Sequence, residues 1–167
     1  MKKTSLLALL GALLLLACVC AGCAKTKPKE IRGILRLRFT YSCGMRSTDQ
    51  VVYTLEKTGE GYTATVKPQG VDPSDPLSVP VDAGFASQVE ELLRTNHVEK
   101  WYNYNKRSRN IMDGIGFTCY LKLEGDKEVD AVGYMNWPEG YSKVEGGLNT
   151  LFMGLWEASG REIPEAY

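Results

Sequence analysis

Apolar and polar residues alternate with a period of two over five stretches of this chain, which is the pattern of strands with one buried and one solvated face. The first stretch runs from Leu35 to Tyr41. Residues 50–67 repeat the pattern on both sides of a glycine-containing turn, and residues 115–135 repeat it around a turn at 124–127. Each of these two segments predicts a β-hairpin. Together the stretches predict a mainly antiparallel sheet of about five strands.

Two other segments have apolar residues at helical spacing. Residues 83–96 carry such a stripe, and Asp82 can serve as the N-cap. Ser142 and Glu145 form a capping-box pattern at the start of a second helix, which we expect to end near Gly160. The order of three strands, a helix, two strands and a helix allows both helices to lie on one face of the sheet. The predicted fold class is therefore α+β.

Two connecting segments lack either period. Residues 68–80 contain four prolines, which cannot donate hydrogen bonds to a sheet, so the segment predicts a surface crossing with at most an edge strand at 77–81. Residues 102–110 are polar and aromatic without apolar periodicity, and this predicts an exposed loop.

The chain begins with a segment that does not belong to the fold. Lys2 and Lys3 precede an apolar run over 6–17, after which three cysteines follow closely. The run is shorter than the roughly 20 residues of a membrane-spanning helix and has the length of a signal-peptide core. We therefore predict a signal peptide over residues 1–17 and export of the protein.

The cysteines after this run predict a lipid anchor. Leu15-Leu16-Ala17-Cys18 resembles a bacterial lipobox, and Cys23, preceded by Ala21-Gly22, is the alternative, in which case the signal peptide extends to residue 22. Acyl chains on this cysteine would hold the protein on the extracytoplasmic face of a bacterial membrane. Residues 18–30 are then a flexible tether that spans up to roughly 40 Å.

The remaining chain is long enough for one globular domain. We expect this single domain to cover residues 31–160, with a C-terminal tail at 161–167. The full sequence has 20 Lys and Arg against 20 Asp and Glu. This balance argues against a nucleic-acid partner, which requires concentrated positive charge.

The residues that usually carry catalysis or bind metals are sparse. The chain has one histidine, His97, at the expected end of the first helix, and its acidic residues are scattered. We therefore predict no catalytic residue, no metal site and no cofactor. Cys43 and Cys119 can both point to the buried face of the sheet, where they would form either a disulfide or two core thiols.

The strongest candidate for a binding surface is a group of aromatic and basic residues around the loop after the first helix. The group consists of Trp101, Tyr102, Tyr104, Arg107 and Arg109, together with Trp137 and Tyr141. Aromatic rings offer a large contact area and arginine offers directional donors, which suits recognition of a protein or a glycan. In the alternative interpretation, Trp101 and Trp137 close the open end of the core.

Most of residues 31–158 also resemble a known group of proteins. The resemblance is carried by Val98-Glu99-Lys100-Trp101, Asp113-Gly114, Phe117, the turn at 124–126, Ala131-Val132-Gly133-Tyr134, Trp137-Pro138 and Tyr141. In this succession the chain resembles an uncharacterised family of small bacterial lipoproteins. The resemblance implies one α+β domain behind a lipobox signal peptide and implies no activity.

These observations favour a membrane-anchored lipoprotein whose domain is a non-enzymatic binding or interaction module with a protein or glycan partner. One alternative is a carboxylate-based hydrolase that acts on cell-envelope or carbohydrate material. A second alternative is a structural subunit of an envelope assembly, which would present a contiguous apolar patch.

Overall fold

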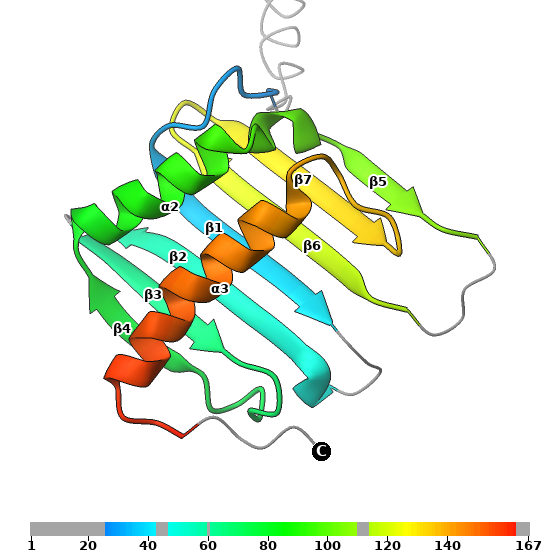
Figure 1. The fold of residues 1–167 in the computed structure, drawn as a ribbon. Helices are drawn as coiled ribbons and strands as arrows, with labels where there is room; N and C mark the ends of the chain where they lie inside the picture. The colour runs from blue at the N-terminus through cyan, green and yellow to red at the C-terminus, as the bar shows by residue number, and fades with distance from the viewer. Residues whose placement is uncertain (1–25, 43–46, 60, 110–113, 163–167) are drawn as a thin grey trace, which may run out of the picture.

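A computed structural model describes residues 26–162 except 43–46, 60 and 110–113, and within them the chain forms one seven-stranded sheet with two α-helices (Figure 1). The strands are β1 (Ile34–Ser42), β2 (Gln50–Thr58), β3 (Gly61–Lys67), β4 (Leu77–Val81), β5 (Tyr104–Arg107), β6 (Gly116–Leu123) and β7 (Lys127–Tyr134). The α-helices are α2 (Ala83–Thr95) and α3 (Tyr141–Ala158), and two short 3-10 helices are η1 (Ser47–Asp49) and η2 (Val98–Trp101).

The predicted α+β class is confirmed, but the sheet is larger than the five strands expected. The predicted element order is wrong as well, because among the described elements four strands precede α2 and three lie between α2 and α3. Its order is β4-β3-β2-β1-β6-β7-β5, and the described pairs are antiparallel except β5 with β7. β4 is the edge strand that the sequence allowed at 77–81. β5 lies where an exposed loop was predicted, because Tyr104 pairs with Ala131 and Arg107 pairs with Tyr134 along the outer edge of β7. A four-residue polar strand has no apolar alternation of its own, so its sequence does not reveal it.

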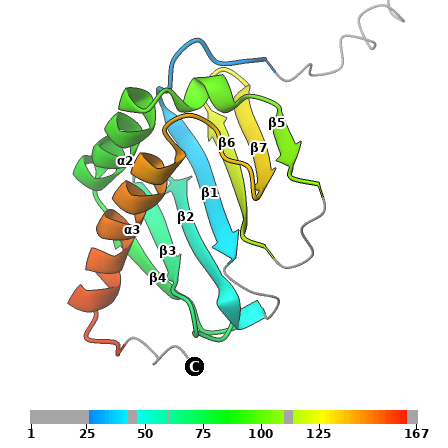
Figure 2. The same cartoon turned by 45° about the vertical axis from the view of Figure 1, so that its right-hand side comes forward.

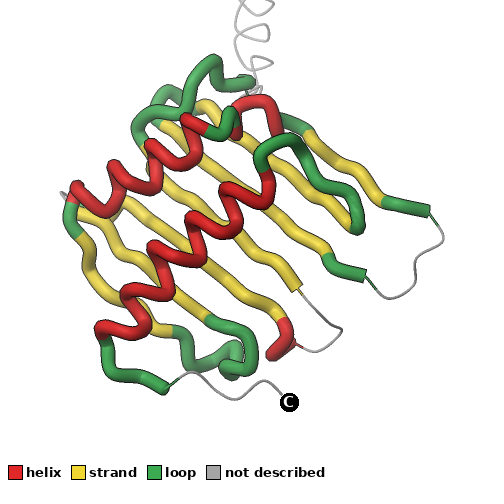
Figure 3. The backbone as a smooth tube through the Cα atoms, in the orientation of Figure 1, coloured by secondary structure: helices red, strands yellow, loops and turns green. Residues whose placement is uncertain are grey.

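Both α-helices cover the same face of the sheet, as predicted (Figures 1 and 2). Figure 3 shows the helices in front of the strands, with the crossing at 68–76 at the far end from η2. The buried strand side chains of the core include Leu37, Phe39, Tyr53, Leu55, Val66, Leu121 and Val129. Val89 and Leu93 of α2 and Leu148 and Phe152 of α3 complete this core.

The opposite face of the sheet is polar, so it requires no second layer of helices. The strand register aligns its side chains in rows across the sheet. One such row contains Ser78, Thr65, Thr54, Arg38, Tyr120 and Asp130.

The two helices begin differently. Asp82 caps α2 as predicted, because its carboxylate accepts a hydrogen bond from the Phe85 N–H at 2.8 Å. The capping box predicted for the second helix is wrong: α3 begins at Tyr141, one residue before Ser142, and its N-cap is Gly140 with φ of 79° and no side-chain cap bond. A cap without a side chain permits a close backbone approach there, which shapes the site described below.

The first described residues are attached to the domain. Thr26 forms a parallel bridge with Lys127, and its hydroxyl donates a hydrogen bond to the Asp126 carbonyl at 3.4 Å. Pro28 is buried. Residues 26–30, expected to be part of a flexible tether, therefore lie on the domain beside the β6–β7 turn.

Cys119 is a free thiol in the core, and Cys43, its expected partner in a disulfide, lies outside the described residues. Cys119 lies opposite Phe39 in the β1–β6 register and is fully buried. This burial raises the pKa of the thiol from its ordinary value of 9.0 to about 12, with a smaller contribution from Asp130.

We expect Cys119 to make the domain less stable at alkaline pH. Its folded-state pKa is raised, so its contribution to stability is complete below about pH 9 and declines toward pH 12, as the unfolded thiol ionises and the folded one does not. Urea unfolding across this range measures the decline. Burial also raises the pKa of Tyr53, which acts in the same direction. The Cys119→Ala variant isolates the contribution of the thiol. If the free energy of unfolding declines with pH as steeply in this variant as in the wild type, the prediction is contradicted.

Candidate functional site

An aromatic cluster joins β6 to the start of α3. Its centre is Phe117, whose ring centroid lies 4.7 Å from that of Tyr141, 5.7 Å from that of Trp137 and 5.9 Å from that of Trp101. Trp137 stacks on Tyr141 at 4.7 Å and remains 39% exposed. The cluster is therefore core on one side and accessible surface on the other.

A cavity of about 350 Å³ lies beside this cluster, between the end of α2, η2 and the start of α3, and we call it the helix-end pocket. Its lining residues are Thr95, Asn96, His97, Lys100, Trp101, Tyr104, Pro138, Glu139, Gly140 and Lys143.

Backbone geometry brings the two walls of the helix-end pocket together. α2 ends at Thr95, and its C-cap is Asn96, whose side-chain amide donates to the Leu92 carbonyl at 2.8 Å. His97 follows in the left-handed region with φ of 56°. Across the pocket, a Cβ on Gly140 would lie 3.0 Å from the Asn96 carbonyl oxygen. Glycine at this position therefore allows the start of α3 to approach the end of α2.

Trp101 connects the walls on the side of the core. Its ring is 1% exposed, and its Nε1 donates a hydrogen bond to the Glu139 carbonyl at 2.9 Å. Tyr104 forms the adjacent wall, and its hydroxyl donates to Oδ1 of Asn136 at 2.5 Å. Burial raises the pKa of Tyr104, so this phenol remains neutral and acts as a hydrogen-bonding group. These contacts fix the aromatic part of the pocket.

The charges around the pocket are predominantly positive. Lys100 and Lys143 are exposed at its rim, and no ion pair between described residues involves either of them. His97 contacts Glu99 through Nδ1 at 3.1 Å, while Glu139 is the acidic residue among those that line the cavity. Two ammonium groups beside indole and phenol rings can bind a ligand that has both an anionic group and an apolar or ring-shaped part.

The structure brings together part of the predicted binding group. Trp101 and Tyr104 line the helix-end pocket, and Trp137 and Tyr141 belong to the aromatic cluster beside it. Trp101 also closes the open end of the core, which is the alternative role that the sequence allowed for it. Tyr102 is half-buried next to Trp101 in the chain.

The two arginines of the predicted group lie elsewhere. Asn105 and Arg107 pair with residues on the polar face of the sheet, and the Arg107 guanidinium lies 4.8 Å from the Tyr134 ring centroid. Arg109 follows β5 and is exposed. The period of two in β5 separates Arg107 from Tyr104, because successive side chains point to opposite faces.

Sequence reasoning missed the two lysines of the pocket and gave His97, at the expected end of the first helix, no part in a site. His97 is exposed just after the end of α2, and it also lines the cavity. Lys143 lies in the first turn of α3, where cations are disfavoured by the helix dipole. The unfavourable position of Lys143 was the sequence signal that could have drawn attention to it. It does not indicate which residues of the other elements face Lys143.

A groove of about 760 Å³ runs between α2 and α3 and is larger than the helix-end pocket. Its apolar walls are the half-buried Leu92 and Leu151, and Gly147 forms its base, where a Cβ would lie 2.5 Å from Leu92. Glu91, its charged residue, already forms an ion pair with Arg94. The groove brings no aromatic or unpaired charged groups together and is a weaker candidate site.

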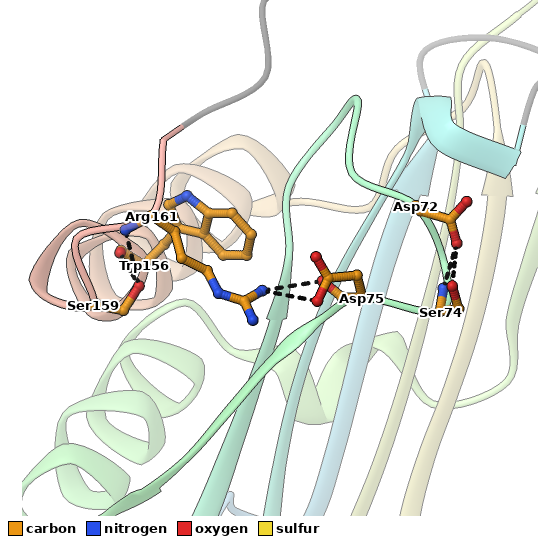
Figure 4. A network of polar contacts seen from close by, with 6 residues as sticks. All are labelled: Asp72, Ser74, Asp75, Trp156, Ser159 and Arg161. Atoms are coloured by element: carbon orange, nitrogen blue, oxygen red, sulfur yellow. Dashed lines mark hydrogen bonds and ion pairs between the residues drawn. The ribbon is translucent and has the colours of Figure 1, made fainter.

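A second polar cluster lies at the opposite end of the domain, where α3 ends beside the crossing at 68–76 (Figure 4). Arg161 extends from the end of α3 over the Trp156 ring and reaches Oδ1 of Asp75 at 3.3 Å. The Asp72 carboxylate accepts hydrogen bonds from the Ser74 hydroxyl and N–H, and these lower its pKa. A general acid needs a raised pKa, so Asp72 is suited to holding the crossing in place rather than to proton donation.

Comparison with known proteins identifies no relative: no protein-family model matches the chain, and no curated protein matches it significantly. In the part of the chain that the structure describes, no helix is both long and apolar enough to cross a membrane.

Proposed function

We propose that this protein is a lipid-anchored envelope lipoprotein whose domain binds a ligand without transforming it, and that the helix-end pocket is the binding site. The observation that carries the proposal is the convergence of Lys100 and Lys143 on a cavity walled by Trp101 and Tyr104. Concave sites with an apolar wall and a few convergent polar groups are typical of ligand binding.

The anchor in this proposal is a diacylglyceryl group on Cys18, with Cys23 as the alternative. Support comes from the signal-peptide pattern and the lipobox-like Leu15-Leu16-Ala17-Cys18. Mass measurement of the mature N-terminal peptide from bacterial membranes tests this proposal. Diacylglyceryl cysteine at position 18 or 23 is expected, and an intact Met1 with unmodified cysteines would contradict it.

Removing the two pocket lysines should abolish ligand retention without unfolding the domain. The full-length protein is purified from membranes in detergent as wild type and as Lys100→Gln/Lys143→Gln. Co-retained glycans, lipids and proteins are then quantified by mass spectrometry. Each lysine bound to an anion is worth about 1.5–3 kcal/mol, so removing both should lower retention of the specific ligand by about a hundredfold or more. The free energy of unfolding should change by less than about 0.5 kcal/mol, as for ordinary surface sites.

The matched control is Lys122→Gln/Lys127→Gln, which removes the same charge from positions outside the pocket. This control should retain the ligand at the wild-type level. Identical retention profiles for wild type, the control and the pocket variant would reject the helix-end pocket as the binding site.

A further inference from the structure

The chain leaves the domain at the same end as the helix-end pocket. Thr26 pairs with Lys127 at the start of β7, and four residues further along β7 Ala131 pairs with Tyr104, which lines the pocket. Four strand residues correspond to about 13 Å. Figures 1 and 2 agree on this arrangement: residues 26–33, η2 and the end of α2 lie together, and the end of α3 lies at the other extreme.

Further contacts hold residues 26–33, which we call the exit segment, against this end of the domain. The Gly33 N–H donates a hydrogen bond to Glu90 of α2 at 2.7 Å, and the Gly33 carbonyl accepts one from the Glu124 N–H at 2.9 Å. The exit segment is therefore fixed to both α2 and the β6–β7 turn.

The spacer between anchor and domain is short. Thr26 follows Cys18 by only eight positions, so the spacer reaches at most about 26 Å, and from Cys23 it reaches at most about 10 Å. An anchored domain is then held within a short distance of the lipid headgroups by the end that carries the pocket. The opposite end, with Asp72, Asp75 and Arg161, points away from the bilayer.

We propose that the helix-end pocket binds the anionic headgroup of a phospholipid in the membrane that carries the anchor. This inference rests on the lipid anchor and the binding site of the proposed function. The positive rim at Lys100 and Lys143 matches a phosphate-bearing headgroup in charge, and lysines near an anionic membrane are each attracted by about 1 kcal/mol. Tyr104 supplies a ring surface of the kind found where a protein meets the polar region of a bilayer, and the buried Trp101 supports the pocket from behind.

Lysine acylation by a water-soluble, amine-reactive acylating reagent tests the inference on the full-length, lipidated wild-type protein. The protein is reconstituted into phosphatidylcholine vesicles, into vesicles that also contain phosphatidylglycerol, and into phosphatidylcholine vesicles with added inorganic phosphate. Peptide mass spectrometry follows the acylation of each lysine. Phosphatidylglycerol should slow acylation of Lys100 and Lys143 by about fivefold, the factor that corresponds to the usual lysine attraction at an anionic surface.

The other outcomes overturn the inference in distinguishable ways. Equal acylation of Lys100 and Lys143 in all vesicles, with the lipidated N-terminus confirmed by mass, rejects headgroup binding and leaves the anchor intact. Slowing at Lys127 but not at the two pocket lysines places this end on the membrane with the pocket unoccupied by lipid. Slowing by inorganic phosphate alone identifies a soluble anion as the ligand. An unmodified N-terminus contradicts the proposed anchor instead.

Discussion

Replacing Phe117 by alanine is expected to lower the free energy of unfolding by about 3–5 kcal/mol, the usual cost of deleting a buried phenylalanine side chain. Phe117 is 2% exposed, and its ring contacts those of Phe39, Trp101, Tyr104, Trp137 and Tyr141. Its removal leaves a cavity that these rings cannot fill without moving. Because domains are stable by only about 5–15 kcal/mol, urea unfolding should show a large shift of the midpoint.

The matched control for Phe117→Ala is Trp137→Ala. Trp137 belongs to the same cluster but is 39% exposed, so its loss should cost about 1 kcal/mol, close to the value of an aromatic pair. Equal costs for the two variants would show that Phe117 does not organise the cluster. Because Trp101 and Tyr104 contact Phe117, the Phe117 variant should also lose the ligand of the helix-end pocket.

Replacing Gly133 by alanine is expected to destabilise the domain by about 1–3 kcal/mol or more, although it adds a single methyl group. Gly133 is buried in β7, where a Cβ would lie 2.2 Å from Cε1 of Phe117 and 2.3 Å from the carbonyl oxygen of Asn136. Neither neighbour can move easily, because one is a packed ring and the other is backbone. Thermal unfolding measured by circular dichroism should detect the change.

Gly154→Ala is the matched control for Gly133→Ala and should have the opposite sign. A Cβ at Gly154 of α3 would meet no atom within 4 Å. Alanine should therefore stabilise the helix by about 1 kcal/mol through its higher helix propensity. The prediction fails if Gly133→Ala is tolerated as well as Gly154→Ala, because β7 would then be able to shift away from Phe117.

The elements that the sequence predicted well are those whose signal is local. The helix over 83–96 is α2, because Asp82 supplies the cap and the stripe with Val89 and Leu93 supplies the buried face. The two hairpins are β2–β3 and β6–β7, because glycine turns join alternating segments. Leu35, expected at a buried position, is only half-buried, because the register shifts between Ile34 and Arg36 and places Ile34 in the core.

The features that the sequence did not predict depend on partners that are distant along the chain. Lys67 is an example: it is buried, and its ammonium group donates hydrogen bonds to the carbonyls of Thr48 and Gln50 and to that of Pro68. Burial lowers its pKa, and the carbonyls compensate for the lost water. A lysine at the end of a predicted strand gives no local sign of such an environment.

The sequence by itself determined the α+β class, most strands, both α-helices and the pattern on which the proposed export and anchoring rest. These depend on periodicity and composition within short segments, which act before any tertiary contact forms. The tertiary structure alone decided the sheet order, the parallel pairing of β5 and the meeting of Lys100 with Lys143 beside Trp101. A period of two indicates which face of a strand is buried but not which neighbour it pairs with, so a site built from four separate elements becomes visible only after the chain has folded.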